Sequence, residues 1–277
     1  MMSQTSTTAI NPENYRFLQK YVHSHVGIVP DDSKEYLFQS RLASLVKQLS
    51  FGSINDLCAE MDSKRDVGVG HQIEAAMTTN EAYFFCDPAH YDAIRTMLPL
   101  MWREERRAKK SLRSWSAAAS TGQEGYSLAM LLLEVELPSC DLQILGADFP
   151  SKVVERARCG MYRQIGVNRG LPASLLVKHF RHSSTDSQIS DEVRKMARFE
   201  TIDLRKTMHT LDRFDLSFCC NVMIYFDNQA KQSPLKELHR TLFRGGWLLL
   251  GGAETAFGVD EWFERKAVGS ATVYVAR

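Results

Sequence analysis

The sequence predicts an α/β protein in which a small all-helical N-terminal domain precedes a mostly parallel sheet covered by helices. Between Asn11 and Met77, apolar residues recur at the three- and four-residue spacing of helices, with no strand pattern. Beyond Ser111, short apolar runs alternate with segments of helical periodicity, which is typical of a parallel sheet. A hairpin pattern around Gly269-Ser270 indicates that the sheet ends with an antiparallel strand.

Four helices are expected in the N-terminal domain. Asn11 can cap the first helix, because its side chain can accept a backbone N–H, and Pro12 suits the first helical position. Ser53 is expected to begin the third helix. The apolar stripes, in chain order, are Tyr15, Leu18, Val22 and Val26; Phe38, Leu42, Leu45 and Leu49; Leu57 and Met61; and Val69, Ile73, Ala76 and Met77.

The second part of the chain alternates strands with helices. Expected strands cover residues 112–118, 142–147, 214–220 and 247–251, and a hairpin covers 262–268 and 271–276. Expected helices cover residues 88–110, 124–137, 151–159 and 228–243.

Residues 161–199 break this pattern. They are polar and irregular, with only a short helix from Pro172 to His179, which favours an insertion on the sheet over a core layer. The expected organisation is a disordered tail at 1–10, a helical domain at 11–78, and a sheet domain at 79–277 with a subdomain inserted at about 161–199.

Composition limits the class of protein. The 277 residues are 44% hydrophobic and 24% charged, as in a globular chain that forms a core. The longest apolar stretches, around Leu128–Leu133 and Trp247–Leu250, are far shorter than the roughly 20 residues of a membrane span. Met1 to Ile10 lacks the basic start and apolar centre of a secretory signal, so we expect a cytoplasmic protein without membrane insertion.

Cysteine spacing and charge exclude further classes. The six cysteines contain no C-x-x-C pair, which argues against a structural zinc site and a disulfide framework, so no metal is expected. The net charge of +1 gives no overall reason to expect a nucleic-acid partner. A basic run from Arg103 to Arg113 is the only feature that favours one, and a solvated helix end explains that run as well.

Candidate site residues follow the strands. In an open parallel sheet, ligands bind at the carboxyl ends of the strands, and here the first strand-to-helix turn is Ala118 to Glu124. That turn lacks the G-x-G-x-x-G pattern of dinucleotide sites, and the carboxylate of Glu124 would repel phosphate and attract a cation. This suits S-adenosylmethionine (SAM), which has no phosphate and carries an ammonium and a sulfonium. The alternative is that the Glu124 carboxylate only interacts favourably with the positive N-terminal end of its helix.

Three further residues also follow or end a predicted strand. Asp148 ends the second strand, where a carboxylate can accept hydrogen bonds from both ribose hydroxyls. Asn221 and Tyr225 follow the strand at 214–220, although an aromatic there is often only packed core.

Four sequence stretches together resemble the CheR family of chemotaxis protein methyltransferases, over essentially the whole chain from Asn11 to Arg277. These stretches are MTTNEAYFF at 77–85, WSAAASTGQE at 115–124, GAD at 146–148 and NVMIYF at 221–226. The resemblance implies a Rossmann-like SAM-dependent sheet domain, an all-helical N-terminal domain and a short β-rich insertion.

The resemblance also implies roles for individual residues. Tyr225 falls on a tyrosine proposed to act near the transferring methyl group. Cys86 and Cys220 depart from the family, because both stand where arginine is usual. Gly125 and Asp203 also replace a usual proline and a usual asparagine. The implied cofactor contacts are Asn80, Cys86, Glu124, Asp148, Asp203, Leu204, Cys220 and Asn221.

The implied function is SAM-dependent methylation of glutamate side chains on the cytoplasmic domain of methyl-accepting chemotaxis receptors, with S-adenosylhomocysteine as product. A receptor C-terminal tail is a further possible contact, and the enzyme is expected to be a monomer without a nucleic-acid partner. Arg41 and Lys47 of the helical domain are expected to face the acidic receptor. The alternative is a catalytically weakened relative that acts as a SAM-binding sensor or scaffold, which the two cysteines favour.

Overall fold

The computed structural model describes the chain in segments that form two compact units, one from residues 9–77 and one from residues 82–277. The first unit is helical, and the second contains every strand of the described chain. The described segments are 9–26, 35–64, 67–77, 82–101, 111–135, 140–149, 151–183, 185–204, 208, 211–223, 231–252, 254–256 and 258–277.

The N-terminal unit consists of α1 (Pro12–Val26), α2 (Glu35–Gln48), α3 (Ile54–Lys64) and α4 (Val67–Met77). Asn11 caps α1 as predicted, since its Oδ1 accepts the Asn14 backbone N–H at 2.7 Å. Ser53 Oγ accepts the Asp56 N–H at 3.2 Å and so caps α3. All residues of the predicted stripes except Val26, whose side chain is not described, pack in one shared core, in which Leu18, Phe38, Leu42, Leu57 and Ile73 are fully buried.

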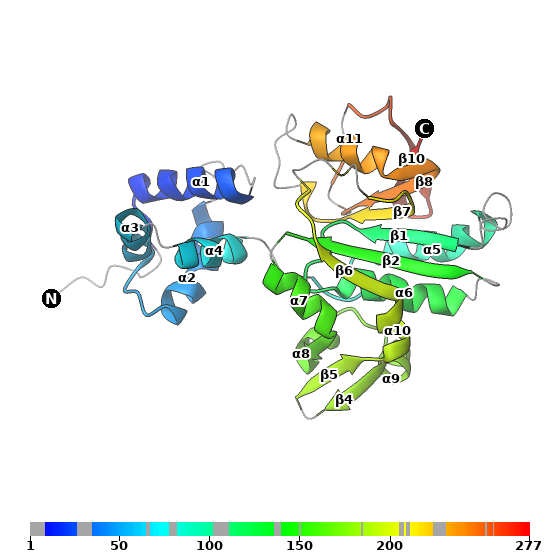
Figure 1. Ribbon diagram of the computed structural model, residues 1–277, viewed down its shortest axis with the longest axis horizontal. Helices are drawn as coiled ribbons and strands as arrows, with labels where there is room; N and C mark the ends of the chain where they lie inside the picture. The colour runs from blue at the N-terminus through cyan, green and yellow to red at the C-terminus, as the bar shows by residue number, and fades with distance from the viewer. Residues whose placement is uncertain are drawn as a thin grey trace. The chain divides into compact units, whose positions relative to one another are not determined.

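The second unit is built on a seven-stranded sheet with the order β6-β2-β1-β7-β8-β10-β9 (Figure 1). Parallel pairs join β6 through β8, and β10 is antiparallel to both β8 and β9. The predicted α/β class and its antiparallel ending are therefore confirmed. The strands are β1 (Ser111–Ser116), β2 (Asp141–Asp148), β6 (Ala197–Thr201), β7 (Phe214–Cys219), β8 (Leu242–Leu250), β9 (Phe263–Val268) and β10 (Ala271–Ala276).

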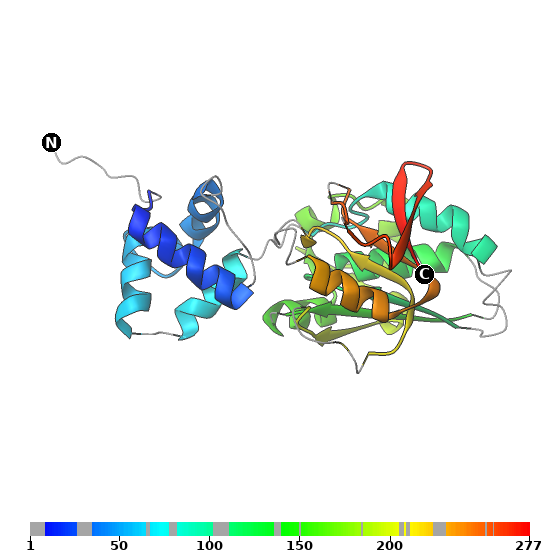
Figure 2. The same cartoon turned by 90° about the horizontal axis from the view of Figure 1, so that it is seen from above.

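Helices cover this sheet, and every residue of the central strand β7 is buried. α5 (Pro88–Met101) packs on α6 (Gln123–Val135), and α6 packs in turn on β1, β2 and β6. α7 (Ser151–Cys159) contacts β2 and β6, and α11 (Gln232–Arg240) contacts β8. The hairpin β9–β10 is the red ribbon in Figure 2. No helix in the segments that the structure describes combines the length and apolarity needed to cross a bilayer.

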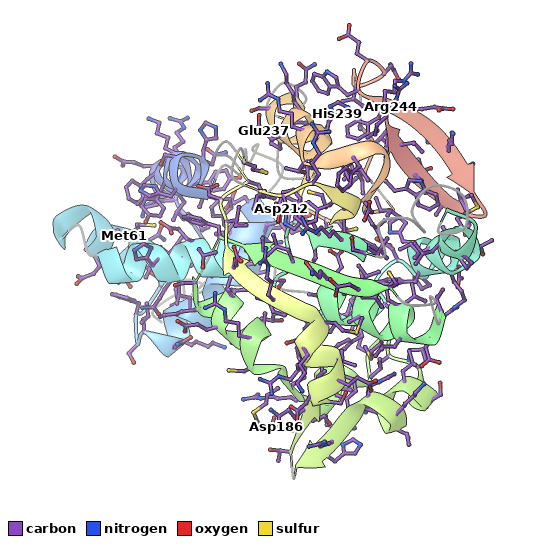
Figure 3. The ribbon with its side chains drawn as sticks, turned by 45° about the vertical axis from the view of Figure 1, so that its right-hand side comes forward. Met61, Asp186, Asp212, Glu237, His239 and Arg244 are labelled. Atoms are coloured by element: carbon purple, nitrogen blue, oxygen red, sulfur yellow. The ribbon has the colours of Figure 1, made fainter. Side chains whose placement is uncertain are left out.

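The insertion is more ordered than its polar sequence indicated. A three-stranded antiparallel sheet of order β3-β5-β4 lies at the far end of this unit from α11 (Figure 1), and Asp186 in β5 is labelled in Figure 3. The β-rich insertion that the family resemblance implied is therefore confirmed. The residue pattern alone indicated irregular chain with one helix, because short strands paired by a turn carry little periodicity. The elements are β3 (Met161–Arg163), α8 (Gln164–Val167), α9 (Ala173–His179), β4 (Phe180–Ser183), β5 (Asp186–Ile189) and α10 (Asp191–Met196).

The boundary between α11 and β8 also differs from the prediction. The helix ends at Arg240 and the strand begins at Leu242, so Gly245-Gly246 lies inside the strand and not before it. The register between β7 and β8 shifts there, and Gly245 has a φ of 77°. A side chain at Gly246 would approach Phe243 O at 2.8 Å, so this glycine pair forms a bulge in β8.

Gly146 on β2 generates a stability prediction. A Cβ at this position would lie 2.3 Å from the ring of Phe199, which is buried on the neighbouring strand β6. We expect Gly146→Ala to destabilise the protein by about 1–3 kcal/mol through overpacking, as measured by urea unfolding. A second substitution, Phe199→Leu, should recover part of the loss because it removes the obstructing ring edge.

Gly166→Ala is the matched control, since a Cβ at Gly166 meets no atom within 4 Å. Equal stability of Gly146→Ala and the unmodified chain would contradict the close approach of Phe199.

Candidate active site

The loop after β1 sets the geometry of the sheet's carboxyl edge. Ser120 and Gly122 have positive φ values of 48° and 96°, and the Gly122 N–H donates to Ala119 O at 2.8 Å. A Cβ on Gly122 would lie 3.0 Å from Ala157 Cβ, so only glycine fits between this turn and α7. The Tyr162 hydroxyl donates to Thr121 O at 2.6 Å and ties the loop to the insertion.

Glu124 lies in the first turn of α6, where protein encloses most of its side chain. Its Oε1 accepts a hydrogen bond from Ser116 Oγ at 2.7 Å. Burial raises the pKa of Glu124 to about 7; hydrogen bonds from Ser116 and Cys220 oppose the shift, and the charges of Asp87 and Glu254 add to it. This carboxylate therefore lies among other acids, an environment that a bound cation would stabilise.

Asp148 ends β2 beside the same loop. Its Oδ2 accepts the Ser120 N–H and its Oδ1 accepts the Phe149 N–H, both at 2.8 Å. Burial raises the pKa of Asp148, and these two backbone hydrogen bonds oppose the shift. Each carboxylate oxygen has two lone pairs, so each keeps one free to accept a hydroxyl group.

Asp203 and Leu204 follow β6, the strand next to β2. The Ile202 N–H donates to Asp148 O at 3.0 Å, which brings the chain before Asp203 alongside the end of β2. Both residues are half-buried. These two candidates thus lie at the same edge as Glu124 and Asp148, because carboxyl ends of parallel strands share one edge.

Cys86 and Cys220, the two cysteines that stand where the family usually has arginine, are neighbours of Asn221. Asn221 Nδ2 lies 3.9 Å from Cys86 Sγ, as a weak hydrogen bond. Burial raises the pKa of the Cys86 thiol, while hydrogen bonds with Tyr83 and Asn221 lower it. Cys220 follows β7 and lies 3.9 Å from Leu249 O, and its thiol also interacts with the Glu124 carboxylate.

Glu254 belongs to this site, although sequence reasoning missed it. Its Oε2 accepts the Asn221 N–H at 2.8 Å and the Gly251 N–H at 2.7 Å, so it joins the chain after β7 to the chain after β8. A lone acid in a loop carries no sequence signal. The same holds for Ser116, which lies on β1 and donates to Glu124.

Non-glycine residues with left-handed backbone conformations cluster at the same edge of the sheet. Phe85, Asp87, Ser120 and Asn221 are four of the five non-glycine residues with positive φ in the described chain, with values from 48° to 60°. They come from the segment before α5, the loop after β1 and the end of β7. Such conformations cost about 1–3 kcal/mol each and persist where surrounding contacts impose them, most often at functional sites.

The insertion contacts the segment before α5 through Phe84. The Phe84 ring packs edge-on against Tyr162 and Phe180, at centroid distances of 5.0 and 5.4 Å. A Cβ on Gly170 would lie 2.1 Å from Phe84 O, so the turn that ends in Gly170 touches this backbone directly. Next to it, the Arg169 guanidinium lies 4.7 Å from the centre of the Tyr83 ring.

The other predicted residues lie outside the described residues or in the helical unit. Asn80 and Tyr225 lie outside the described residues, as does most of the basic run at 103–113. Arg41 Nη1 donates to Met77 O at 2.5 Å and so closes the end of α4, a contact within the helical unit. Lys47 is exposed.

The sequence matches two family models. Residues 80–271 match the CheR methyltransferase SAM-binding domain, and residues 13–68 match the CheR methyltransferase all-alpha domain. The chain belongs to the CheR methyltransferase family. It is therefore a SAM-dependent methyltransferase, and the family, fold class and cofactor predicted from the sequence are confirmed.

Curated relatives cover almost the full chain. Chemotaxis protein methyltransferase 1 of Vibrio cholerae serotype O1 is 32% identical over 96% of this chain and 97% of the relative. A chemotaxis protein methyltransferase of Vibrio parahaemolyticus has the same identity and coverage. Chemotaxis protein methyltransferase 1 of Pseudomonas aeruginosa is 29% identical over 95% of this chain and 98% of that protein.

The charges of the described residues in this CheR family member are complementary to those of SAM. Glu124 lacks a basic partner among its described interactions, so the ammonium or sulfonium of the cofactor would compensate its charge. The small residues of the loop from Ala117 to Gly122 let backbone approach a ligand. Phosphate would be repelled by the same carboxylates, which fits a cofactor without phosphate.

Glu124 generates a pH-dependent stability prediction. Its carboxyl would titrate near 4.5 when unfolded and near 7 when folded, so folding favours the protonated form. The stability that the protonated Glu124 carboxyl contributes is complete below pH 4.5 and is lost as the pH rises to 7. Glu124→Gln keeps the acceptor for Ser116 and removes the charge, so at pH 8 the ligand-free variant should be more stable by up to about 3 kcal/mol.

Urea unfolding at pH 5 and pH 8 measures this effect, which should grow with pH. Glu134→Gln, at the other end of α6, is the control, because the pKa of Glu134 is shifted in the opposite direction. A hydrogen bond from Lys178 lowers the pKa of Glu134, so its removal should not stabilise the protein at pH 8. A less stable Glu124→Gln variant at pH 8 would show that the carboxylate is compensated without ligand.

Proposed function

We propose that this protein transfers the methyl group of SAM to glutamate side chains on the cytoplasmic domains of chemotaxis receptors, forming methyl esters. The observation that carries the proposal is the acidic, phosphate-excluding edge formed by Glu124 and Asp148 in a chain of the CheR family. The names of the curated relatives, chemotaxis protein methyltransferases, support a substrate within chemotaxis.

When bound, the cofactor supplies an electrophilic methyl group on a sulfonium. Glu124 would hold the positive end of the cofactor, and Asp148 would accept hydrogen bonds from its ribose hydroxyls. Asn221 is held by Glu254 through its backbone, so its side chain remains oriented toward Cys86 and the site. By family resemblance, Asn80, Asp203, Leu204, Cys86 and Cys220 would complete the cofactor contacts.

A glutamate substrate makes few demands on catalytic groups. Its carboxyl has an ordinary pKa of about 4.3, so it is already an ionised nucleophile at neutral pH and needs no general base. Attack forms an oxygen–methyl bond as the sulfur–methyl bond breaks, and the sulfur keeps the electron pair. An anion and a cation are consumed, so an enclosed site and good positioning accelerate the reaction. Tyr225 is proposed to act near the methyl group.

The deciding experiment is methylation of receptor-rich membranes with tritiated SAM, followed by alkali treatment. A carboxyl methyl ester releases volatile tritiated methanol, and we expect this release with the purified chain. Asp148→Asn should lower the rate at limiting SAM at least tenfold, because the amide nitrogen cannot accept a hydrogen bond. Asp141→Asn, at the exposed start of the same strand, should leave the rate unchanged.

Other outcomes separate the alternatives. SAM binding without methanol release would support the sensor or scaffold reading and contradict the proposal. Label that stays on the substrate after alkali treatment would contradict an ester product.

Arg169 is the cation that we propose to compensate for Cys86. The usual arginine at position 86 could hold a carboxylate by two hydrogen bonds, and a thiol cannot. Tyr83 hydrogen-bonds with Cys86 and also stacks against the Arg169 guanidinium, so the insertion supplies a positive charge close to the lost one. Gly170 makes this approach possible through its contact with Phe84.

Arg169→Gln should therefore lower kcat/KM for methyl transfer about ten- to hundredfold, which corresponds to roughly 1.5–3 kcal/mol. Arg163→Gln, on β3 of the same insertion, is the matched control and should be neutral. Adding Cys86→Arg to Arg169→Gln should restore activity, a result that a purely structural role of Arg169 does not predict. Full activity of Arg169→Gln alone would contradict the assignment.

A further inference from the structure

Three potential metal ligands of different chemistry gather between the start of α5 and the end of β7. Asp87, His90 and Cys220 each present one ligand atom, and these atoms all lie within 4.8 Å of one another. In the part of the chain that the structure describes, no other group of this kind meets that limit. The cluster was invisible to spacing rules, because Cys220 is far from the other two residues in the sequence.

Backbone structure fixes the positions of these side chains. Asp87 precedes Pro88, the first residue of α5, and its O accepts the His90 N–H at 3.0 Å. Asp87 has a φ of 57°, and its Oδ2 accepts the Gly252 N–H at 3.2 Å. Cys220 directly follows β7 and precedes Asn221, whose φ is 60°. A carboxylate oriented by a backbone N–H is the outer-shell arrangement typical of metal sites.

His90 supplies independent evidence for a ligand. Its side chain is 4% exposed, and its Nδ1 is buried without a hydrogen-bond partner in the described structure. An unpaired buried imidazole nitrogen costs free energy, since buried polar atoms are almost always hydrogen-bonded. The histidine ring therefore lies in a cluster of potential donors with an unsatisfied polar atom.

We propose that Asp87, His90 and Cys220 form a binding site for a zinc-class divalent cation. The site shares Cys220 with the proposed cofactor contacts, but zinc binding itself does not require the proposed methylation reaction. Ligands at about 2.0–2.3 Å from tetrahedral zinc lie roughly 3.6 Å from one another, so small side-chain rotations suffice to close the cluster. Three protein ligands leave one coordination position for water.

The donor set selects the metal. A thiolate and an imidazole favour Zn²⁺ over Mg²⁺ or Ca²⁺, which prefer oxygen ligands. Binding replaces the S–H bond of Cys220 with a sulfur–metal bond and releases the proton to solvent. Asp87 and Cys220 are partly exposed, so both residues border solvent.

The chemistry of the surroundings also favours a cation. Glu124 and Glu254 act on Cys220 with negative charge. A divalent ion at the cluster would place positive charge close to these carboxylates.

The test uses the full chain, freed of metal by chelation and kept reduced with a phosphine, without cofactor. Titration with Zn²⁺ against a chromophoric chelator should show one ion per chain, and Mg²⁺ should not compete. Co²⁺ should produce a sulfur-to-metal charge-transfer absorption. Cys220→Ser and His90→Gln should each weaken zinc binding at least tenfold, and Cys220→Ser should abolish that absorption.

Two controls carry the same residue types at exposed positions away from the cluster: Cys159→Ser and His182→Gln should bind zinc normally. Asp87→Asn should keep the folded state and weaken zinc binding, which covers the case in which His90→Gln fails to fold. Zinc should also raise the Tm of the unmodified chain but not of Cys220→Ser. Any of three results would overturn the proposal. These are unchanged zinc affinity in Cys220→Ser and His90→Gln, loss of binding only in Cys159→Ser, and no binding to the unmodified chain.

Discussion

The carboxylate of Glu124, in the first turn of α6, lies close to other acidic groups. Contacts from several elements of the sheet domain hold it in this position. Ser116 reaches it from β1, Cys220 from the end of β7, and the tight turn at Gly122 starts the helix at the required point. Without ligand this arrangement costs stability, because the charge is poorly solvated. A bound cation beside Glu124 would offset that cost and would gain binding energy from it.

The same edge also stores backbone strain. Phe85, Asp87, Ser120 and Asn221 adopt left-handed conformations that glycine would accept more easily. Each of them is held by hydrogen bonds to distant parts of the chain; for example, the Phe85 N–H donates to Ser127 Oγ and the Asn221 N–H donates to Glu254 Oε2. Contacts that are distant in sequence thus determine the conformation of the residues nearest the chemistry.

Long periodic elements could be predicted from the sequence, and elements defined by tertiary contact could not. The four N-terminal helices, β1, β2, β7 and the terminal hairpin follow from apolar spacing and turn residues. The small sheet of the insertion was implied only by the family resemblance and not by periodicity, because β3 and β4 are three and four residues long. In the site, Glu124 and Asp148 could be found because they end or begin regular elements. Glu254 and His90 could not, since only folding brings them to the edge.

The contact between Gly170 and Phe84 has a consequence for how this protein can diverge. With no room for a side chain at the base of the insertion, the base cannot shift without moving the residues next to Cys86. The outer tip near Asp186 and Thr185 is exposed or half-buried and carries no such constraint. Substitutions at the tip can therefore change the outer surface of the insertion while the segment next to Cys86 keeps its conformation, so the two ends of this small sheet can diverge at different rates.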